Sequence, residues 1–159
     1  MNAEQEVARE LVEHAGLNAD KVRVARARRV FAEVEADKFI KVIQYAVEKM
    51  DFAFLCTITG QDEGENMSAM YHLARETGML LNLKVCVPKD HPVLPTVTAL
   101  FPAANVYEHE IKNLLGFRIE GLNEESRYPL SDDWPMDQHP LRKDWDISML
   151  EGKEKTANG

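Results

Sequence analysis

Apolar residues recur at helical spacing in several stretches of the chain. One side of Glu4–Ala15 is apolar, which predicts a short amphipathic helix. In Asp37–Met50 the first residue is a good N-cap, and apolar positions then follow the i, i+4, i+7 pattern of a core-facing stripe. A short helix is predicted over Pro95–Leu100. A longer one is predicted over Ala104–Leu115, where Gly116 stands just past the end.

Four other stretches have the pattern of strands. Arg29–Ala36 alternates apolar and polar residues, as does Met67–Arg75. Phe52–Thr59 is almost continuously apolar, and Met79–Val87 places leucine and valine on one face. Short polar breaks that suit hairpins separate Phe52–Thr59, Met67–Arg75 and Met79–Val87. These three strands are therefore expected to pair as an antiparallel meander.

Helices and strands are partly segregated along the chain, which favours an α+β fold. We expect a small mixed or antiparallel sheet of about four strands flanked by helices, formed by a body of residues 1–120. Residues 121–159 hold three prolines and both tryptophans but have no sustained period. A stretch this apolar without regular structure is typical of an extended arm that lies on its own domain or on a partner.

Composition narrows the classes of partner. The net charge of −8 would repel a phosphate backbone, which argues against general nucleic-acid binding. The longest apolar run, Phe52–Cys56, is far too short for a bilayer, and the acidic N-terminus has no apolar signal core, so a cytoplasmic protein is expected. One basic cluster, from Lys21 to Arg29, is either a solvated edge or a docking patch for an acidic protein or anionic lipid.

Candidate chemistry is sparse. Cys56 and Cys86 lie within apolar strand-like runs, where cysteine usually behaves as a small buried hydrophobe, and no histidine stands at a spacing that pairs it with either as a catalytic base. Adjacent residues on a helix point about 100° apart, so Glu108, His109 and Glu110 cannot converge on one metal ion. We expect a charged helix face there, with Glu108 and Lys112 as an i, i+4 pair. Catalytic, cofactor-binding and metal-binding residues are therefore not predicted.

Two ordered motifs carry a family resemblance. The first is Ala104–Gly121, which contains the Glu108-His109-Glu110 triplet. The second combines Asp132-Asp133-Trp134 with His139–Trp145. Together they resemble the 30 kDa subunit family of respiratory NADH dehydrogenase (complex I), also called the C subunit. The His-Pro-Leu-Arg-Lys-Asp ending is more similar to related subunits of energy-converting membrane-bound [NiFe]-hydrogenases and formate hydrogenlyase.

The resemblance implies a cofactor-free scaffold or accessory subunit of a membrane-associated redox complex, not catalytic when isolated. The partners would be the large hydrogenase-like (quinone-site) subunit and a neighbouring Fe-S subunit. Fe-S clusters, and Ni-Fe or flavin, would lie in other subunits, and the chain would be peripheral to the cytoplasmic face of the membrane. Expected partner-binding residues are Glu108, Glu110, Gly116, Trp134, Pro140, Leu141, Arg142, Lys143 and Asp144.

A different class of function also fits these residues. A free-standing protein-binding module could use the same arm without any redox role. The two hypotheses differ in whether the chain forms a stable complex with a large redox subunit.

Overall fold

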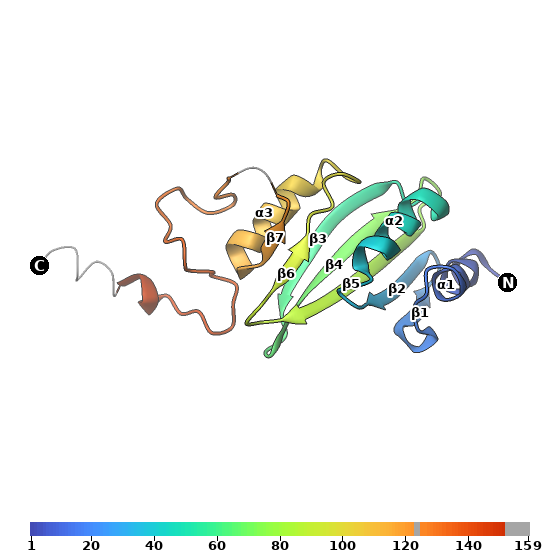
Figure 1. The fold of residues 1–159 in the computed structure, drawn as a ribbon, viewed down its shortest axis with the longest axis horizontal. Coiled ribbons are helices and arrows are strands. Elements are labelled where there is room, and N and C mark those ends of the chain that lie inside the picture. Colours follow the sequence, from blue (N-terminus) through green and yellow to red (C-terminus); the bar gives the residue numbers. More distant parts are fainter. Residues whose placement is uncertain (123–124, 152–159) are drawn as a thin grey trace, which may run out of the picture.

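A computed structural model describes residues 1–122 and 125–151 of the chain. Three long helices and seven strands follow one another along residues 3–120, together with one short 3₁₀ turn, and residues 148–151 of the arm are also helical (Figure 1). Their order is α1 (Ala3–Glu13), η1 (Ala19–Lys21), β1 (Val22–Arg26), β2 (Arg29–Val34), α2 (Phe39–Met50), β3 (Phe54–Asp62), β4 (Asn66–Ala74), β5 (Leu80–Pro88), β6 (Val93–Pro95), α3 (Ala104–Leu115) and β7 (Arg118–Glu120).

Five strands form one mixed sheet with the order β1-β2-β5-β4-β3. Strands β3, β4 and β5 make the expected antiparallel meander, in which Tyr71 lies between Ile58 and Leu83. Strand β2 is parallel to β5, with Val30 opposite Leu81, because α2 and the first two meander strands intervene along the chain. The sheet is thus of the mixed type, with one more strand than the sequence pattern predicts.

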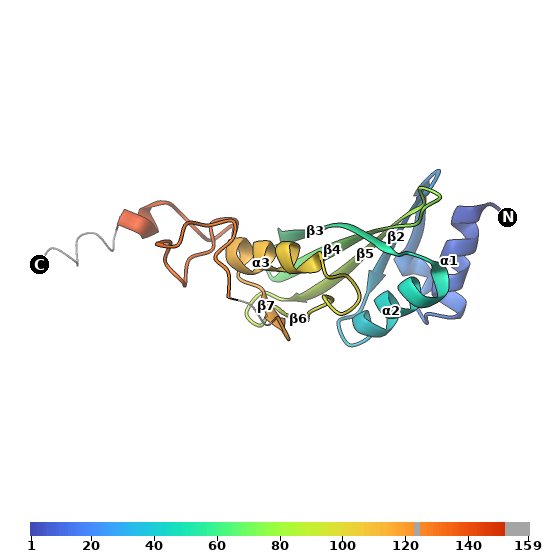
Figure 2. The same ribbon diagram turned by 90° about the horizontal axis from the view of Figure 1, so that it is seen from above.

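The helices and the β6–β7 pair lie on one side of this sheet, and the opposite face is open (Figure 2). On the covered face, α2 buries a stripe that begins at Phe39, whose ring lies 4.7 Å from that of Tyr71. Burial of each such side chain contributes about 1.5–3 kcal/mol. The open face carries polar side chains such as His72 and Lys84, which alternate with the buried ones along β4 and β5.

Helix α3 packs across the outer strand β3. A glycine makes this close approach possible, because a Cβ at Gly60 would lie 2.4 Å from Leu115 Cδ1 and 2.9 Å from Ile111 Cγ2. Strands β6 and β7 precede and follow α3 and pair in parallel, with Leu94 opposite Ile119. The β6–β7 pair holds the two ends of α3 in place. The position of the arm, which attaches to α3, is fixed as a result.

The α+β class, the three long helices and the meander are confirmed. Three details are wrong. Helix α2 begins at Phe39 without a side-chain cap from Asp37. The segment Pro95–Leu100 forms no helix, because it continues from β6 into turns that lead to α3. Strand β1 was not expected, because four of its five residues are exposed and its valines therefore do not mark a buried face.

The cysteines also differ from the expectation of burial. Cys56 is exposed because it occupies a bulge in β3, between Leu55 and Thr57, where the register with β4 shifts. Cys86 is half-buried on the open face of the sheet, and burial raises the pKa of its thiol. Neither side chain belongs to the core.

The contact at Gly60 generates a prediction about stability. Replacement of Gly60 by alanine forces buried Ile111 and Leu115 to shift, which should cost about 1–3 kcal/mol of unfolding free energy. The measurement is urea unfolding, with Gln61→Ala on the exposed side of the same strand as control. Equal stability of the two variants would show that α3 does not pack as closely on β3 as described.

Candidate partner interface

The expected interface residues fall into two groups, one inside α3 and one on the C-terminal arm, which extends from residue 121. In the first group, Glu108 is fully buried. Its carboxylate accepts hydrogen bonds from Thr96 Oγ1 at 2.6 Å and from the Val97 N–H at 2.7 Å. Burial nevertheless raises the pKa of Glu108 above its ordinary value.

This geometry corrects the prediction of a solvated helix face. Glu108 holds the strand-to-helix connection in place, so its side chain is not on the surface that a partner could touch. It also does not pair with Lys112, which lies 3.8 Å from Glu125 instead. Glu110, two residues further on, is half-buried and remains at the surface.

The arm attaches to the body at the C-terminal end of α3. The last four carbonyls of a helix have no partner within the helix. Here three consecutive ones accept hydrogen bonds from the arm: Asn113 O from His139 Nδ1 at 2.8 Å, Leu114 O from Leu141 N at 2.9 Å, and Leu115 O from Arg142 Nε at 2.7 Å. The His-Pro-Leu-Arg motif therefore caps the helix, which is a role inside the chain.

Gly116 makes room for this cap. It ends α3 in the left-handed conformation with φ of 79°, which glycine adopts without strain. A Cβ there would lie 2.7 Å from His139 Cδ2 and 3.0 Å from Arg142 Nη2. Gly116 thus contacts the arm of its own chain.

A buried carboxylate forms the second attachment point. Asp62, at the end of β3, accepts hydrogen bonds from Lys89 Nζ at 2.7 Å, from the Lys143 N–H at 2.9 Å and from the Gly64 N–H at 2.9 Å. Lys89 Nζ also lies 3.4 Å from the carboxylate of Asp144. Burial alone would raise the pKa of Asp62, but these bonds outweigh it and hold the pKa well below 3.8.

The rest of the arm is organised around Gln138, which is only 8% exposed. Its backbone oxygen accepts from Trp134 Nε1 and its side-chain oxygen from Trp145 Nε1, both at 2.9 Å. The two indole rings lie 5.8 Å apart. Earlier in the arm, the Asn113 amide of α3 donates to the backbone oxygens of Ser126 and Tyr128. The arm is therefore ordered by its own contacts and those to the body.

Several large apolar side chains of this ordered arm remain exposed to solvent. Met136 is 70% exposed, Ile147 65% and Leu141 57%. Leu141 also lines a surface groove between β3 and α3, whose walls include Thr59, Glu110 and Leu114. An exposed leucine that lines a groove, together with other exposed apolar side chains on the same arm, is typical of a protein-binding surface.

The structure thus brings seven of the nine expected residues together near the end of α3 and on the arm, with roles that differ. Gly116, Arg142 and the backbone of Lys143 hold the arm to the body, and Pro140 lies within the cap. Leu141, Glu110 and Asp144 face the groove or solvent. Trp134, which precedes the cap residues in the arm, packs against Trp145, and Glu108 lies in the interior.

Sequence reasoning missed Asp62, Lys89, Gln138 and Asn113 as residues that order the arm. A signal existed for Asp62, because an aspartate at the end of a buried strand requires partners. Nothing in a single sequence links it to Lys143, which is 81 positions away.

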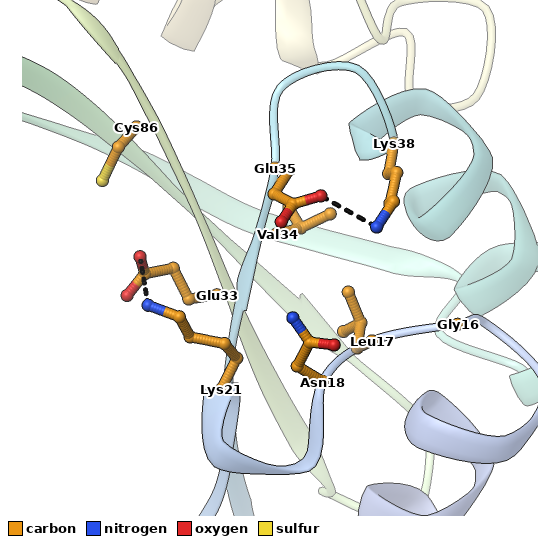
Figure 3. A pocket seen from close by; sticks show the side chains of 9 residues that line it. All are labelled: Gly16, Leu17, Asn18, Lys21, Glu33, Val34, Glu35, Lys38 and Cys86. Atoms are coloured by element: carbon orange, nitrogen blue, oxygen red, sulfur yellow. Dashed lines mark hydrogen bonds and ion pairs between the residues drawn. The ribbon is translucent and has the colours of Figure 1, made fainter.

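A separate hollow of about 210 Å³ lies between the η1 turn, β2 and the start of α2 (Figure 3). Its lysines are paired within the chain: Lys21 lies 3.3 Å from Glu33, and Lys38 lies 2.8 Å from Glu35. Such paired charges do not call for a charged ligand.

Residues 1–122 and 125–151 contain neither a metal-binding cluster nor a helix suited to cross a bilayer. In this part of the chain, no three His, Cys, Asp or Glu side chains cluster in a way that could hold a metal ion. Among its helices, none has the length and apolar character needed to cross a bilayer.

The helix cap generates a prediction about the arm. Arg142→Ala removes a charge-assisted bond to Leu115 O and should cost about 1–2 kcal/mol of unfolding free energy. It should also speed thermolysin cleavage near Leu141. The control is Arg118→Ala, which removes an exposed arginine from β7. Identical cleavage rates for both variants would mean that Arg142 does not hold the arm.

The buried carboxylate generates a prediction about pH. Since the folded state holds the pKa of Asp62 below 3.8, its stabilisation is complete above that pH and is lost progressively below it. Asp62→Asn should therefore lower the unfolding free energy by about 2 kcal/mol at pH 7, with a smaller difference from wild type at pH 3. Urea unfolding at pH 7, 5 and 3 measures this, with exposed Glu65→Gln as control. A difference that stays constant over this range would contradict the assignment.

The chain is similar in sequence to known proteins. The family model "Respiratory-chain NADH dehydrogenase, 30 Kd subunit" matches residues 32–150. The chain is 38% identical over 124 residues to the NADH-quinone oxidoreductase C subunit of Moorella thermoacetica, covering 76% of this chain and 82% of that one. It is 33% identical over 113 residues to formate hydrogenlyase subunit 5 of Escherichia coli, covering 64% of this chain but only 20% of that longer one.

A solved structure is also similar over almost the whole chain. It is that of a membrane-bound sulfane sulfur reductase, an archaeal respiratory membrane complex. One of its chains matches with a TM-score of 0.79 and 27% identity, covering 97% of this chain and 92% of that one. The resemblance drawn from the motifs is confirmed, on both its NADH dehydrogenase and its hydrogenase side. The chain belongs to the respiratory-chain NADH dehydrogenase 30 kDa subunit family.

Proposed function

We propose that this chain is a cofactor-free scaffold subunit of a membrane-associated redox complex, of the NADH dehydrogenase or energy-converting hydrogenase type. Its arm packs on the large catalytic or quinone-site subunit. The observation that carries the proposal is an arm ordered by its own chain that nevertheless exposes Met136, Leu141 and Ile147. Ordered apolar side chains in water are costly unless another surface covers them.

The mode of attachment supports this role. Hydrogen bonds to the end of α3 and to Asp62 hold the arm before any partner arrives. A preorganised arm loses less conformational entropy on binding than a disordered one, so more of the contact energy appears as affinity. Glu110 and Asp144 at the edge of the same surface can fix orientation by charge.

A relative supports the size and nature of the partner. In formate hydrogenlyase subunit 5 the segment similar to this chain is about a fifth of a longer polypeptide. The same fold thus occurs covalently joined to a much larger protein. In a separate chain, an exposed apolar arm can hold the same fold against a large partner without a covalent link.

The remaining parts of the proposal concern chemistry and place. Electron carriers, namely Fe-S clusters and Ni-Fe or flavin, lie in other subunits, and a neighbouring Fe-S subunit is a second contact. The chain reaches the membrane through the complex and stays on its cytoplasmic face. The isolated chain has no turnover of its own.

The test replaces exposed arm side chains and leaves the arm's own bonds intact. Leu141→Asp with Ile147→Asp should reduce recovery of the large subunit at least about tenfold, because the apolar contact is lost while the Leu141 N–H still caps α3. The measurement is co-expression with the large subunit of such a complex from the same organism, followed by size-exclusion chromatography. The control is Ile40→Asp on α2, a similar change on a surface away from the arm.

Unchanged recovery with the arm variant would refute packing through the arm. Two separate peaks for the wild-type chain and the large subunit would favour a free-standing binding module.

A further inference from the structure

A second surface with unusual charge lies at the other end of the molecule. Five of the chain's 19 basic residues fall between Lys21 and Arg29, on the β1–β2 hairpin. Figure 2 shows the tip of this hairpin beside the turn between β4 and β5, at the end opposite the arm. A ligand there and the proposed partner of the arm could therefore bind together.

The arginines of the hairpin differ from the paired lysines of the neighbouring hollow. Within residues 1–122 and 125–151, the guanidinium groups of Arg23, Arg26, Arg28 and Arg29 form no ion pair with a carboxylate within 4.0 Å. Lys21, on the same hairpin, is paired with Glu33. What distinguishes the hairpin is that four such arginines fall within seven residues of the sequence.

The backbone of the hairpin tip is held in place. Arg28 has a left-handed φ of 58°, which is uncommon for a residue with a side chain. Its N–H donates to the carboxylate of Glu4 on α1, which is only 8% exposed, and its carbonyl accepts from Leu80 N at 2.9 Å. Two elements thus fix a turn that would otherwise be free to move.

The fixed tip shapes a concave, basic surface. A hollow of about 410 Å³ is lined by Arg26, Ala27, Arg28, Arg29, Gly78 and Leu80. Arg28 Nη1 approaches Gly78 so closely that a Cβ there would lie 3.3 Å from it. Three guanidinium groups with a fixed backbone around one hollow are arranged to receive several anionic oxygens at once.

We propose that this hollow, the arginine tip, binds an acidic segment of a partner protein through its aspartate or glutamate side chains. Each guanidinium can hold a carboxylate by two parallel hydrogen bonds. The inference is independent of the arm, so it stands or falls separately from the scaffold role.

The surroundings favour a protein segment over a membrane surface. Helix α1 packs against β1 and has two acidic residues, Glu4 and Glu6, in its first turn, with the Glu4 carboxylate at the Arg28 N–H. A broad sheet of anionic headgroups would meet these carboxylates and be repelled within a Debye length of about 8 Å. A narrow acidic segment can enter the hollow and avoid them.

The test uses a fluorescein-labelled octaglutamate peptide as the probe for the full chain. Anisotropy at low salt should show binding that weakens as salt rises. Arg26→Gln with Arg28→Gln should weaken it at least about tenfold, since two charge-assisted contacts are lost. The matched control, Lys41→Gln with Lys49→Gln, changes the net charge equally on α2 and should alter the affinity less than about twofold.

Amide NMR spectra locate the site, with peptide-induced shifts expected at residues 23–29 and 78–80. Equal weakening by both double variants would overturn the proposal, because only the net charge would then matter. Failure of the peptide to bind would overturn it too. If the chain instead sediments with vesicles of phosphatidylcholine and phosphatidylglycerol through the same arginines, the occupant is a membrane and the proposal is wrong.

Discussion

The described structure depends on how the last turn of α3 is completed. The final carbonyls of a helix that ends at the surface are hydrogen-bonded to water. In α3, three of these carbonyls accept hydrogen bonds from a single segment of the same chain. Gly116 turns the chain away and leaves the space that His139 and Arg142 fill. The cap therefore joins the body to the arm and sets the direction in which the arm leaves.

From this joint the arm's remaining order follows. Asp62 receives the N–H of Lys143 just after the cap, and Lys89 neutralises the buried carboxylate. Gln138, just before the cap, accepts hydrogen bonds from the indole N–H groups of both tryptophans. The ordered arm therefore holds exposed apolar side chains such as Met136, Leu141 and Ile147 in fixed positions, which suits a surface that recognises a partner and not a flexible linker.

The sequence predicts much of the body because periodicity reports local burial. The stripe of α2 and the alternation in β4 and β5 lead directly to a helix-covered sheet. This reasoning does not predict strand β1, because its side chains, including its arginines, are mostly exposed and leave no pattern of burial. The parallel pairing of β2 with β5 depends on a crossover, which no local pattern encodes.

The motifs predict residues that lie near the end of α3 and on the arm, but they do not predict the contacts of these residues within the chain. Motifs pointed to α3 and the arm, yet Glu108 and Arg142 serve the chain itself, and a motif cannot distinguish an internal bond from an external one. The contact of Asp62 with Lys143 joins positions far apart in sequence, so only the folded chain reveals it.

Hydrogen–deuterium exchange of the chain alone and in its assembled complex tests the central claim most directly. The account predicts that amides of residues 139–143 are already protected in the free chain, and that assembly adds protection at residues 136–149 and along the groove between β3 and α3. Fast exchange of residues 139–143 in the free chain, or added protection confined to the open face of the sheet, would contradict it.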